Sequence, residues 1–184
     1  MQQTITLPLT YDDLVNTPDD GKRYEIIDGE MLVSASPNRA HQITAQNVNL
    51  VLVDASDRGR LGIVLFAPVD VRLSPHDIVQ PDLLFIHRER LHIYGPTGPV
   101  EGPPDIVVEI LSPTSYARDL VKKAKLYAWG KVPEYWQADA TARTLTVLGL
   151  VDGHYHPIPA EHGIQRSLVL PHLRIDVAAL FEGI

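Results

Sequence analysis

The chain has 184 residues, with 16 Lys and Arg against 23 Asp and Glu, which gives a formal net charge of −7. This length corresponds to one domain, and a content of 45% hydrophobic and 21% charged residues excludes a disordered chain. The absence of cysteine excludes a disulfide scaffold, thiol catalysis and Cys-ligated zinc. The acidic balance argues against a protein that coats nucleic acid, but it does not exclude a nuclease with carboxylates that bind a metal.

Targeting and membrane segments are not evident in the sequence. Its apolar runs are far shorter than the roughly 18 residues that cross a bilayer. The N-terminus, MQQTITLPLTYDD, has no basic region followed by an apolar stretch. We therefore expect one cytoplasmic domain over residues 1–184, without a membrane partner.

The first elements in chain order are a helix and a hairpin. Thr10 followed by Asp13 is a capping pattern, which predicts a short helix over about 11–16. Further along, Asp28-Gly29 separates the β-rich runs RYEII and EMLVS. This arrangement predicts a β-hairpin that turns at Asp28-Gly29.

Residues 40–57 contain neither Gly nor Pro and predict a second helix, which Gly59 ends. The apolar residues near helical spacing in this segment are Ala40, Ile43, Leu50 and Val53. The runs GIVLFA and VDVRL follow and predict two strands joined across Ala67-Pro68.

Two later runs, DLLFIH at 82–87 and DIVVEILS at 105–112, are almost continuously apolar, which is typical of strands in the middle of a sheet. The Gly- and Pro-rich segment 92–104 between them predicts a long surface loop. Residues 115–130 have apolar side chains at steps of three and four, which predicts an amphipathic helix. EYWQAD and RTLTVLGL predict strands, and a short helix is expected near 177–181. This order predicts an α/β or α+β fold around one central mixed sheet.

Asp82 and Glu109 are carboxylates placed within the two apolar runs. If the runs pair as antiparallel strands with these two residues opposed, Leu84 lies opposite Val107 and both carboxylates share one face. Opposed Cβ atoms lie about 5 Å apart, close enough to bind one divalent cation. Without a counter-charge, burial and mutual repulsion would penalise the pair, and Mg²⁺ would remove that penalty. In the alternative, structural interpretation, Asp82 begins a strand and Glu109 forms a salt bridge.

The helix after Glu109 carries a further candidate group. Asp119, Lys123 and Tyr127 follow one another at four-residue steps and share one stripe of the helix. A helix that begins shortly after the strand folds back over the sheet, so Lys123 would reach a scissile phosphate or a metal-bound water. The alternative is a solvated lysine cluster at 122–125, with an exposed Asp119–Lys123 pair that contributes only about 0.3–0.5 kcal/mol.

Four blocks of the sequence, in order, resemble the Uma-two family of endonucleases: RYEIIDGEMLVSASPNRAHQ, QPDLLFI, PPDIVVEILSPTS and DLVKKAKLYAWGKVPEYWQAD. The likeness runs from about residue 10 to 150. The family is similar to the restriction-endonuclease superfamily, which has the core motif P-D…(D/E)-x-K. The resemblance implies a restriction-endonuclease-like core, with a central mixed β-sheet flanked by helices, and hydrolysis of phosphodiester bonds.

Carried over to this sequence, the resemblance makes Asp82 the acid of P-D and Glu109 the second acid. The ligands of Mg²⁺ or Mn²⁺ would be these two carboxylates and the backbone carbonyl of Ile110. The sequence departs from the superfamily at Leu111, which stands where E-x-K has its lysine. The resemblance implies that the lysine has moved to the following helix, as Lys123, where it stabilises the charge of the transition state.

The remaining residues implied by the resemblance have lesser roles. Glu25 would add a ligand or position a water, and so belongs to the catalytic set. His41, Asp119 and Tyr127 would support the site.

A rival motif lies near the C-terminus, where His154-x-His156 followed by Glu161 resembles the metal-binding histidine box of cupins. Pro157 and Pro159 interrupt this segment, so solvated surface histidines are the alternative interpretation. The sequence has no Gly-x-Ser-x-Gly, Walker or dinucleotide-binding motif, and serine hydrolase, NTPase and Rossmann functions therefore lack support.

Our sequence-based hypothesis is a Mg²⁺-dependent endonuclease that acts on nucleic acid, with DNA as the first expectation. The alternative is a catalytically silent nuclease-fold module that binds nucleic acid or self-associates. Duplex cutters need two sites, so we expect a homodimer. Because the net charge is −7, any path for DNA must be a local basic strip. The residues that we expect in this strip are Arg58, Arg60, Lys122, Lys123 and Lys125.

Overall fold

The computed structural model describes residues 7–58, 60–111 and 118–184, with the side chains of 118 and 119 excepted. The helices are α1 (Tyr11–Leu14), α2 (Arg39–Ala55) and α3 (Arg118–Trp129), with 3₁₀ turns η1 (Arg88–Ile93) and η2 (Ala179–Phe181). The strands of the first half are β1 (Arg23–Ile27), β2 (Glu30–Ser34), β3 (Gly62–Phe66), β4 (Val71–Ser74), β5 (Asp77–Val79) and β6 (Leu83–His87). Those of the second half are β7 (Val100–Glu101), β8 (Ile106–Leu111), β9 (Glu134–Asp139), β10 (Thr144–Val151), β11 (His154–Ile158), β12 (Ile164–Arg166) and β13 (Arg174–Asp176).

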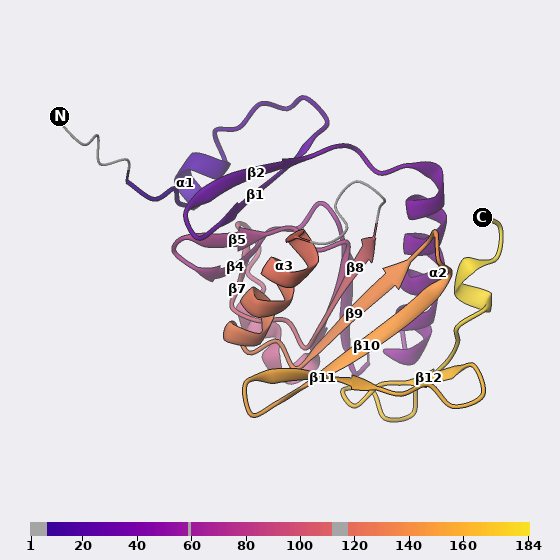
Figure 1. Ribbon diagram of the computed structural model, residues 1–184. Helices are drawn as coiled ribbons and strands as arrows, with labels where there is room; N and C mark the ends of the chain where they lie inside the picture. Colours follow the sequence, from indigo (N-terminus) through magenta and orange to yellow (C-terminus); the bar gives the residue numbers. More distant parts are fainter. Residues whose placement is uncertain (1–6, 59, 112–117) are drawn as a thin grey trace.

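The strands form two main sheets rather than the single sheet that we expected (Figure 1). A six-stranded mixed sheet has the order β11-β10-β9-β8-β6-β3, and a five-stranded sheet has the order β2-β1-β5-β4-β7. The pair β12–β13 forms a small third sheet. The α/β class with a central mixed sheet and flanking helices is confirmed, and the second sheet is the addition.

The centre of the six-stranded sheet has the predicted register. β6 and β8 are antiparallel, and Leu84 lies opposite Val107. On one face of these strands, Leu83 and Val108 pack in the core that contains α2. On the other face, Leu84 and Val107 pack in the core that contains α3 and parts of the five-stranded sheet. Both faces are covered, which accounts for the nearly continuous apolar runs.

Helix α2 is confirmed, but its inner face is not the set of apolar residues that we noted. Leu50 is 59% exposed and Val53 is 37% exposed. The inner face follows steps of three and four residues and consists of Thr44, Val48, Leu52 and Ala55. Gly59, the expected end of this helix, lies outside the described residues, and the helix ends at Ala55 with Ser56 as its C-cap.

The predicted hairpin is present, and its turn has the expected conformation. Asp28 and Gly29 both have positive φ, 55° and 75°, as a two-residue turn of type I′ requires. The hairpin strands β1 and β2 belong to the five-stranded sheet, which β1 joins through β5. The two strands expected on either side of Ala67-Pro68 are also present, but the chain changes sheet there, since β3 and β4 belong to different sheets.

The segment 92–104 is not wholly a surface loop. Val100 is fully buried, and its short strand β7 pairs in parallel with β4 at the edge of the five-stranded sheet. A single valine among glycines and prolines does not form the apolar run that would predict a strand. The chain end near 177–181 contains only the 3₁₀ turn η2.

The remaining features of the second half agree with the prediction. The strands expected at EYWQAD and RTLTVLGL are β9 and β10. His154 and His156 lie on β11 and are exposed, as surface histidines would be. Within the described part of the chain, no helix has the length and apolar character to cross a membrane.

Candidate active site

Asp82 lies immediately before β6, and both of its carboxylate oxygens are hydrogen-bonded. The backbone N–H of Ile110 donates to Oδ2 at 2.7 Å, and Nε2 of His41 lies 3.1 Å from the same oxygen. Arg23 donates from Nη2 to Oδ1 at 2.6 Å. Burial alone would raise the pKa of Asp82, but the hydrogen bond with His41 and the charge of Arg23 outweigh burial and lower it to about 2. The side chain is therefore a carboxylate at neutral pH.

Glu109 lies on β8, where the β6–β8 register places it opposite Asp82 and on the same face. Its Oε1 accepts hydrogen bonds from Nζ of Lys123 at 2.9 Å and from the hydroxyl of Tyr127 at 2.6 Å. Burial raises the pKa of Glu109, and the charge of Lys123 opposes this effect. Burial, together with the charge of Glu109, also raises the pKa of Tyr127 well above its usual value, so this phenol remains a proton donor.

Glu25 comes from the other sheet, on β1. Its Oε1 lies 2.9 Å from Nζ of Lys123 and accepts the backbone N–H of Gln80 at 2.8 Å. Lys123 thus bridges Glu25 and Glu109, and all three side chains are buried. Burial lowers the pKa of Lys123, but the two carboxylates outweigh burial and raise it, so the ammonium keeps its charge.

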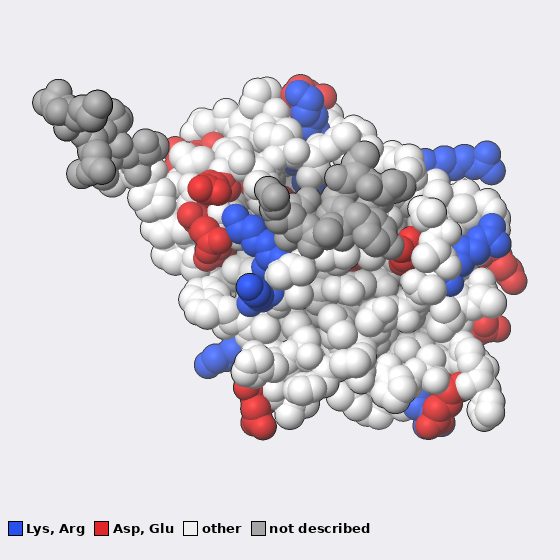
Figure 2. Space-filling model, in the orientation of Figure 1, with Lys and Arg blue, Asp and Glu red and all other residues white. Residues whose placement is uncertain are grey.

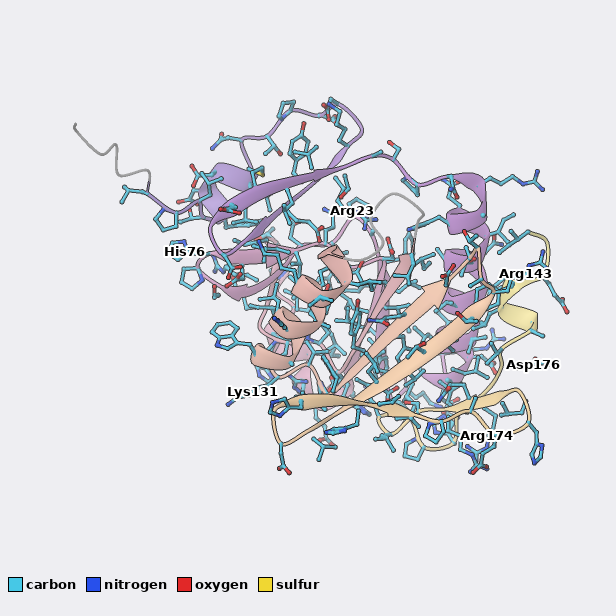
Figure 3. The ribbon with its side chains drawn as sticks, viewed as in Figure 1. Arg23, His76, Lys131, Arg143, Arg174 and Asp176 are labelled. Carbon is cyan, nitrogen blue, oxygen red and sulfur yellow. The ribbon has the colours of Figure 1, made fainter. Side chains whose placement is uncertain are left out.

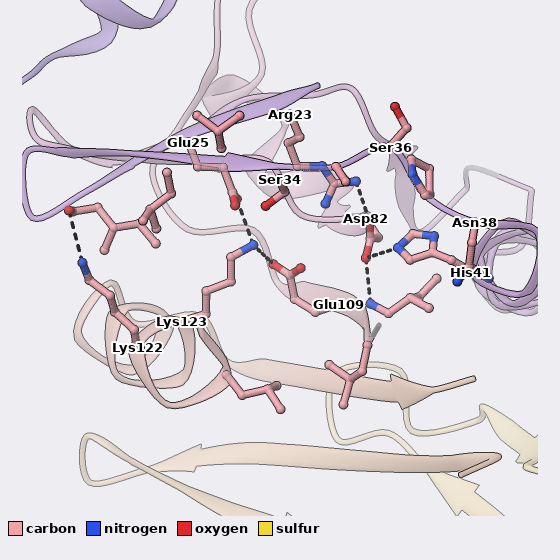
Figure 4. Close-up of a pocket in the computed structure, with 18 of the residues that line it drawn as sticks. Arg23, Glu25, Ser34, Ser36, Asn38, His41, Asp82, Glu109, Lys122 and Lys123 are labelled. Carbon is pink, nitrogen blue, oxygen red and sulfur yellow. Dashed lines mark hydrogen bonds and ion pairs between the residues drawn. The ribbon is translucent and has the colours of Figure 1, made fainter. Parts of the chain in front are cut away.

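These groups line one pocket of about 580 Å³ between the two sheets (Figure 4). The elements that contribute to it are β1, β2, the start of α2, the residue before β6, the end of β8, the early turns of α3 and β9. Ser34, Ser36 and Asn38 line one part of the wall. Asn38 also caps α2, since its side chain accepts the backbone N–H of His41.

The acid pair has counter-charges within the chain itself. Arg23 and His41 contact Asp82, and Lys123 contacts Glu109. Each carboxylate therefore has a cationic or hydrogen-bonding partner supplied by the chain itself. The five-stranded sheet makes this possible, because it brings Arg23 close to residues about 60 positions further along the chain.

The predicted stripe of α3 is only partly described. Lys123 and Tyr127 contact Glu109, as the four-residue spacing indicated. Asp119 belongs to the same helix, but its side chain lies outside the described residues. The alternative of Lys123 as an exposed residue is wrong, since its side chain is only 11% exposed.

The expected basic strip is not continuous. Lys123 is buried in the site, whereas Lys125 is exposed. Lys122 lines the pocket near the hairpin turn, with Nζ 3.5 Å from Asp28 Oδ2. Arg58 and Arg60 follow the C-terminal end of α2, about 25 Å from the end that bears His41, since a 17-residue helix rises 1.5 Å per residue. On the face shown in Figure 2, Lys and Arg side chains are scattered, and Asp and Glu lie beside several of them.

Arg23 was missed as a site residue. It points from β1 into the space between the sheets (Figures 3 and 4). The sequence contained a usable indication, because side chains alternate along a strand and Arg23 therefore shares the face of Glu25. Its partner Asp82 was not predictable locally, since 59 positions separate them.

Comparison with known proteins adds the family. The model of the Uma2 family, described as "Putative restriction endonuclease", matches residues 10–178. A search of curated proteins found no match. Among solved structures, a protein described as a "putative nuclease belonging to DUF820" from Anabaena variabilis is similar, with a TM-score of 0.77 and 18% identity over 95% of this chain and 98% of that chain. At this identity the structural likeness establishes the fold, and the match over 169 residues of sequence establishes that the chain belongs to the Uma2 family of restriction-endonuclease-like nucleases.

Proposed function

We propose that the protein is a metal-dependent endonuclease that hydrolyses phosphodiester bonds of DNA. The observation that carries this proposal is the convergence of Asp82, Glu109, Glu25 and Lys123 on one pocket. They come from both sheets and from α3, so the fold rather than local sequence assembles them. Three carboxylates and a lysine in a pocket are suited to hold a cation and a phosphate together.

The donor set fits a hard divalent cation with few protein ligands. Within the described ranges, no three His, Cys, Asp or Glu side chains lie close enough to form a metal cage. Mg²⁺, however, is commonly bound by one or two carboxylates and keeps several waters. Asp82 and Glu109, with the carbonyl of Ile110, would hold Mg²⁺ or Mn²⁺ in this way. When bound, the cation would supply Lewis-acid polarisation of the phosphate and a water of lowered pKa.

The chain's own residues have distinct tasks in this proposal. Lys123 keeps its proton and stabilises negative charge on the phosphorane-like transition state, while Tyr127 fixes the Glu109 carboxylate through its hydroxyl. Glu25 orients Lys123 and positions a water. His41 and the N–H of Ile110 fix the orientation of Asp82.

A second candidate is a catalytically silent module that binds nucleic acid or self-associates. It is favoured by the complete pairing of Asp82, since Arg23, His41 and Ile110 satisfy both oxygens without a metal. Calorimetric titration with Mn²⁺ separates the two candidates. The nuclease proposal requires a binding isotherm that Asp82→Ala abolishes, and the silent module requires none.

The activity test is cleavage of duplex, single-stranded and branched DNA and of RNA, each with Mg²⁺ and with Mn²⁺. Glu109→Gln should abolish cleavage in the presence of the cation that supports cleavage by the wild-type protein. Glu182→Gln is the matched control, because Glu182 is exposed and outside the pocket. Equal cleavage by wild type and Glu109→Gln would overturn the proposal.

We also propose a homodimer and a DNA path along α3. Lys122 and Lys125 lie on the helix that carries Lys123, one at the pocket and one exposed. Each would contact at most about one phosphate, so Lys122→Met or Lys125→Met should reduce the salt dependence of DNA binding by about one unit of slope. Two active sites in a dimer would cut both strands of a duplex.

A further inference from the structure

Arg23 lines the same pocket as the three site carboxylates and pairs with one of them, Asp82. Its Nη2 lies 2.6 Å from Oδ1 of Asp82, and its side chain is only 18% exposed. Burial lowers the pKa of Arg23, but the charges of Asp82, Glu109 and Glu25 outweigh burial and raise it. The guanidinium of Arg23 therefore keeps its positive charge in this pocket and pairs directly with Asp82.

The two oxygens of Asp82 differ in how firmly they are held. Oδ2 accepts the backbone N–H of Ile110, which belongs to a central strand and is fixed by the sheet, and it also contacts His41 on α2. Oδ1 is bonded only to the flexible, partly exposed side chain of Arg23 among the described residues. Oδ1 is therefore the oxygen that can become free without a change in the backbone.

We infer that Arg23 is a built-in substitute for the divalent cation: it pairs with Asp82 in the metal-free protein, leaves Oδ1 when a cation is bound, and then binds a non-bridging oxygen pair of the substrate phosphodiester. This inference rests on the proposed function. Arg23 lines the same pocket as Lys123 and Glu109, so a rotation of its long side chain can keep the guanidinium within reach of a phosphate bound there. A guanidinium is suited to this role, since its planar fork matches phosphate oxygens.

This change of partner by Arg23 explains how the site remains stable both without and with a bound cation. Two carboxylates without a cation repel each other, and a buried carboxylate without a partner is costly. Arg23 supplies the missing charge while the site is empty. After the cation binds, the guanidinium of Arg23 pairs instead with the negatively charged phosphate.

The direct test is nuclear magnetic resonance of ¹⁵N-labelled arginine side chains in the full-length wild-type protein. In EDTA, the guanidinium N–H signals of Arg23 should be protected from exchange by the bond to Asp82. Titration with Mg²⁺ should remove this protection, and dimethyl phosphate, the smallest phosphodiester, should restore it at a new chemical shift. Arg90 is the internal control, because it forms a comparable 2.7 Å bond with Asp105 outside the pocket and should not respond.

Variants supply an independent measurement by calorimetry with Mn²⁺. Arg23→Met should bind Mn²⁺ about tenfold more tightly than wild type or better, because the cation no longer competes with a charge-assisted hydrogen bond. Arg90→Met should change the affinity by less than about twofold. Should Arg23→Met fail to fold, the wild-type resonance experiment still decides the matter.

The outcomes separate this inference from the proposed function. If Mg²⁺ binds, Asp82→Ala abolishes binding and the Arg23 signals stay protected, the exchange is overturned while the metal site stands. If Mg²⁺ and Mn²⁺ bind neither wild type nor Arg23→Met, the proposed function fails and the exchange fails with it. If protection is lost with Mg²⁺ but dimethyl phosphate does not restore it, the phosphate-binding half of the inference is overturned.

Discussion

Lys123→Met tests whether the buried carboxylates Glu25 and Glu109 depend on the ammonium group between them. Methionine has a similar length and retains the apolar stem, so the change removes mainly the ammonium. That ammonium lies 2.9 Å from Oε1 of Glu25 and 2.9 Å from Oε1 of Glu109. After the substitution, two buried carboxylates face each other without the cation that separates them.

The size of the effect follows from burial. Glu25 and Glu109 are 3% and 7% exposed, and removal of one partner of a buried ion pair costs about 3–5 kcal/mol. For a domain of this size, 1 kcal/mol corresponds to about 2–4 °C in Tm, so the midpoint should fall by about 6–20 °C. Since loss of Lys123 raises the pKa of Glu109 further, the folded state binds protons more readily than the unfolded state. The loss of stability should therefore be largest at neutral pH and shrink as the pH falls through the raised pKa.

The assay is urea unfolding in EDTA at several pH values between 5 and 8, followed by far-ultraviolet circular dichroism. Lys122→Met is the matched control, because it lies one residue away on α3 and its nearest carboxylate oxygen is 3.5 Å from Nζ, on an exposed aspartate. It should cost less than about 1 kcal/mol. In the same proteins, single-turnover cleavage at saturating metal should fall by about 10²-fold for Lys123→Met alone.

Two results would refute this reasoning. One is a free energy of unfolding for Lys123→Met equal to that of Lys122→Met, which would mean that the two carboxylates do not depend on the ammonium. The other is a loss of stability that grows as the pH falls, since protonation of Glu109 can only relieve its repulsion with Glu25.

Three further predictions concern Asp82, Tyr127 and the oligomeric state. Because the pKa of Asp82 is held at about 2, its contribution to stability is complete above about pH 4 and is lost as the pH falls toward 2. Asp82→Asn should lower Tm in EDTA at pH 7 and remove that acid-dependent slope, and an unchanged slope in acid unfolding would contradict the assignment. Tyr127→Phe should cost about 1–3 kcal/mol in urea unfolding, since it removes the 2.6 Å bond to Glu109; a neutral result would show that the bond contributes nothing net. Light scattering at micromolar concentrations should give the mass of a homodimer, and a strict monomer would remove the proposed arrangement of paired sites.

The sequence alone determined the elements whose patterns are local or periodic. The apolar runs that became β6 and β8 identified the central strands, and the period of two placed Asp82 and Glu109 on one face. The four-residue spacing on α3 correctly directed Lys123 and Tyr127 toward Glu109. These inferences succeeded because the geometry of a strand or a helix fixes the direction of each side chain relative to its neighbours.

Only the tertiary structure decided what surrounds these groups. The sequence did not indicate a second sheet, so it missed Arg23 as the partner of Asp82, and it also suggested an inner face for α2 that is exposed at Leu50. Both errors have one cause: apolar periodicity predicts that a segment has a buried face, but which element covers that face depends on contacts between distant residues. The ion pairs of the site join residues of the five-stranded sheet to residues of the six-stranded sheet and α3. The register of one strand or the spacing along one helix does not indicate which other segment packs against it.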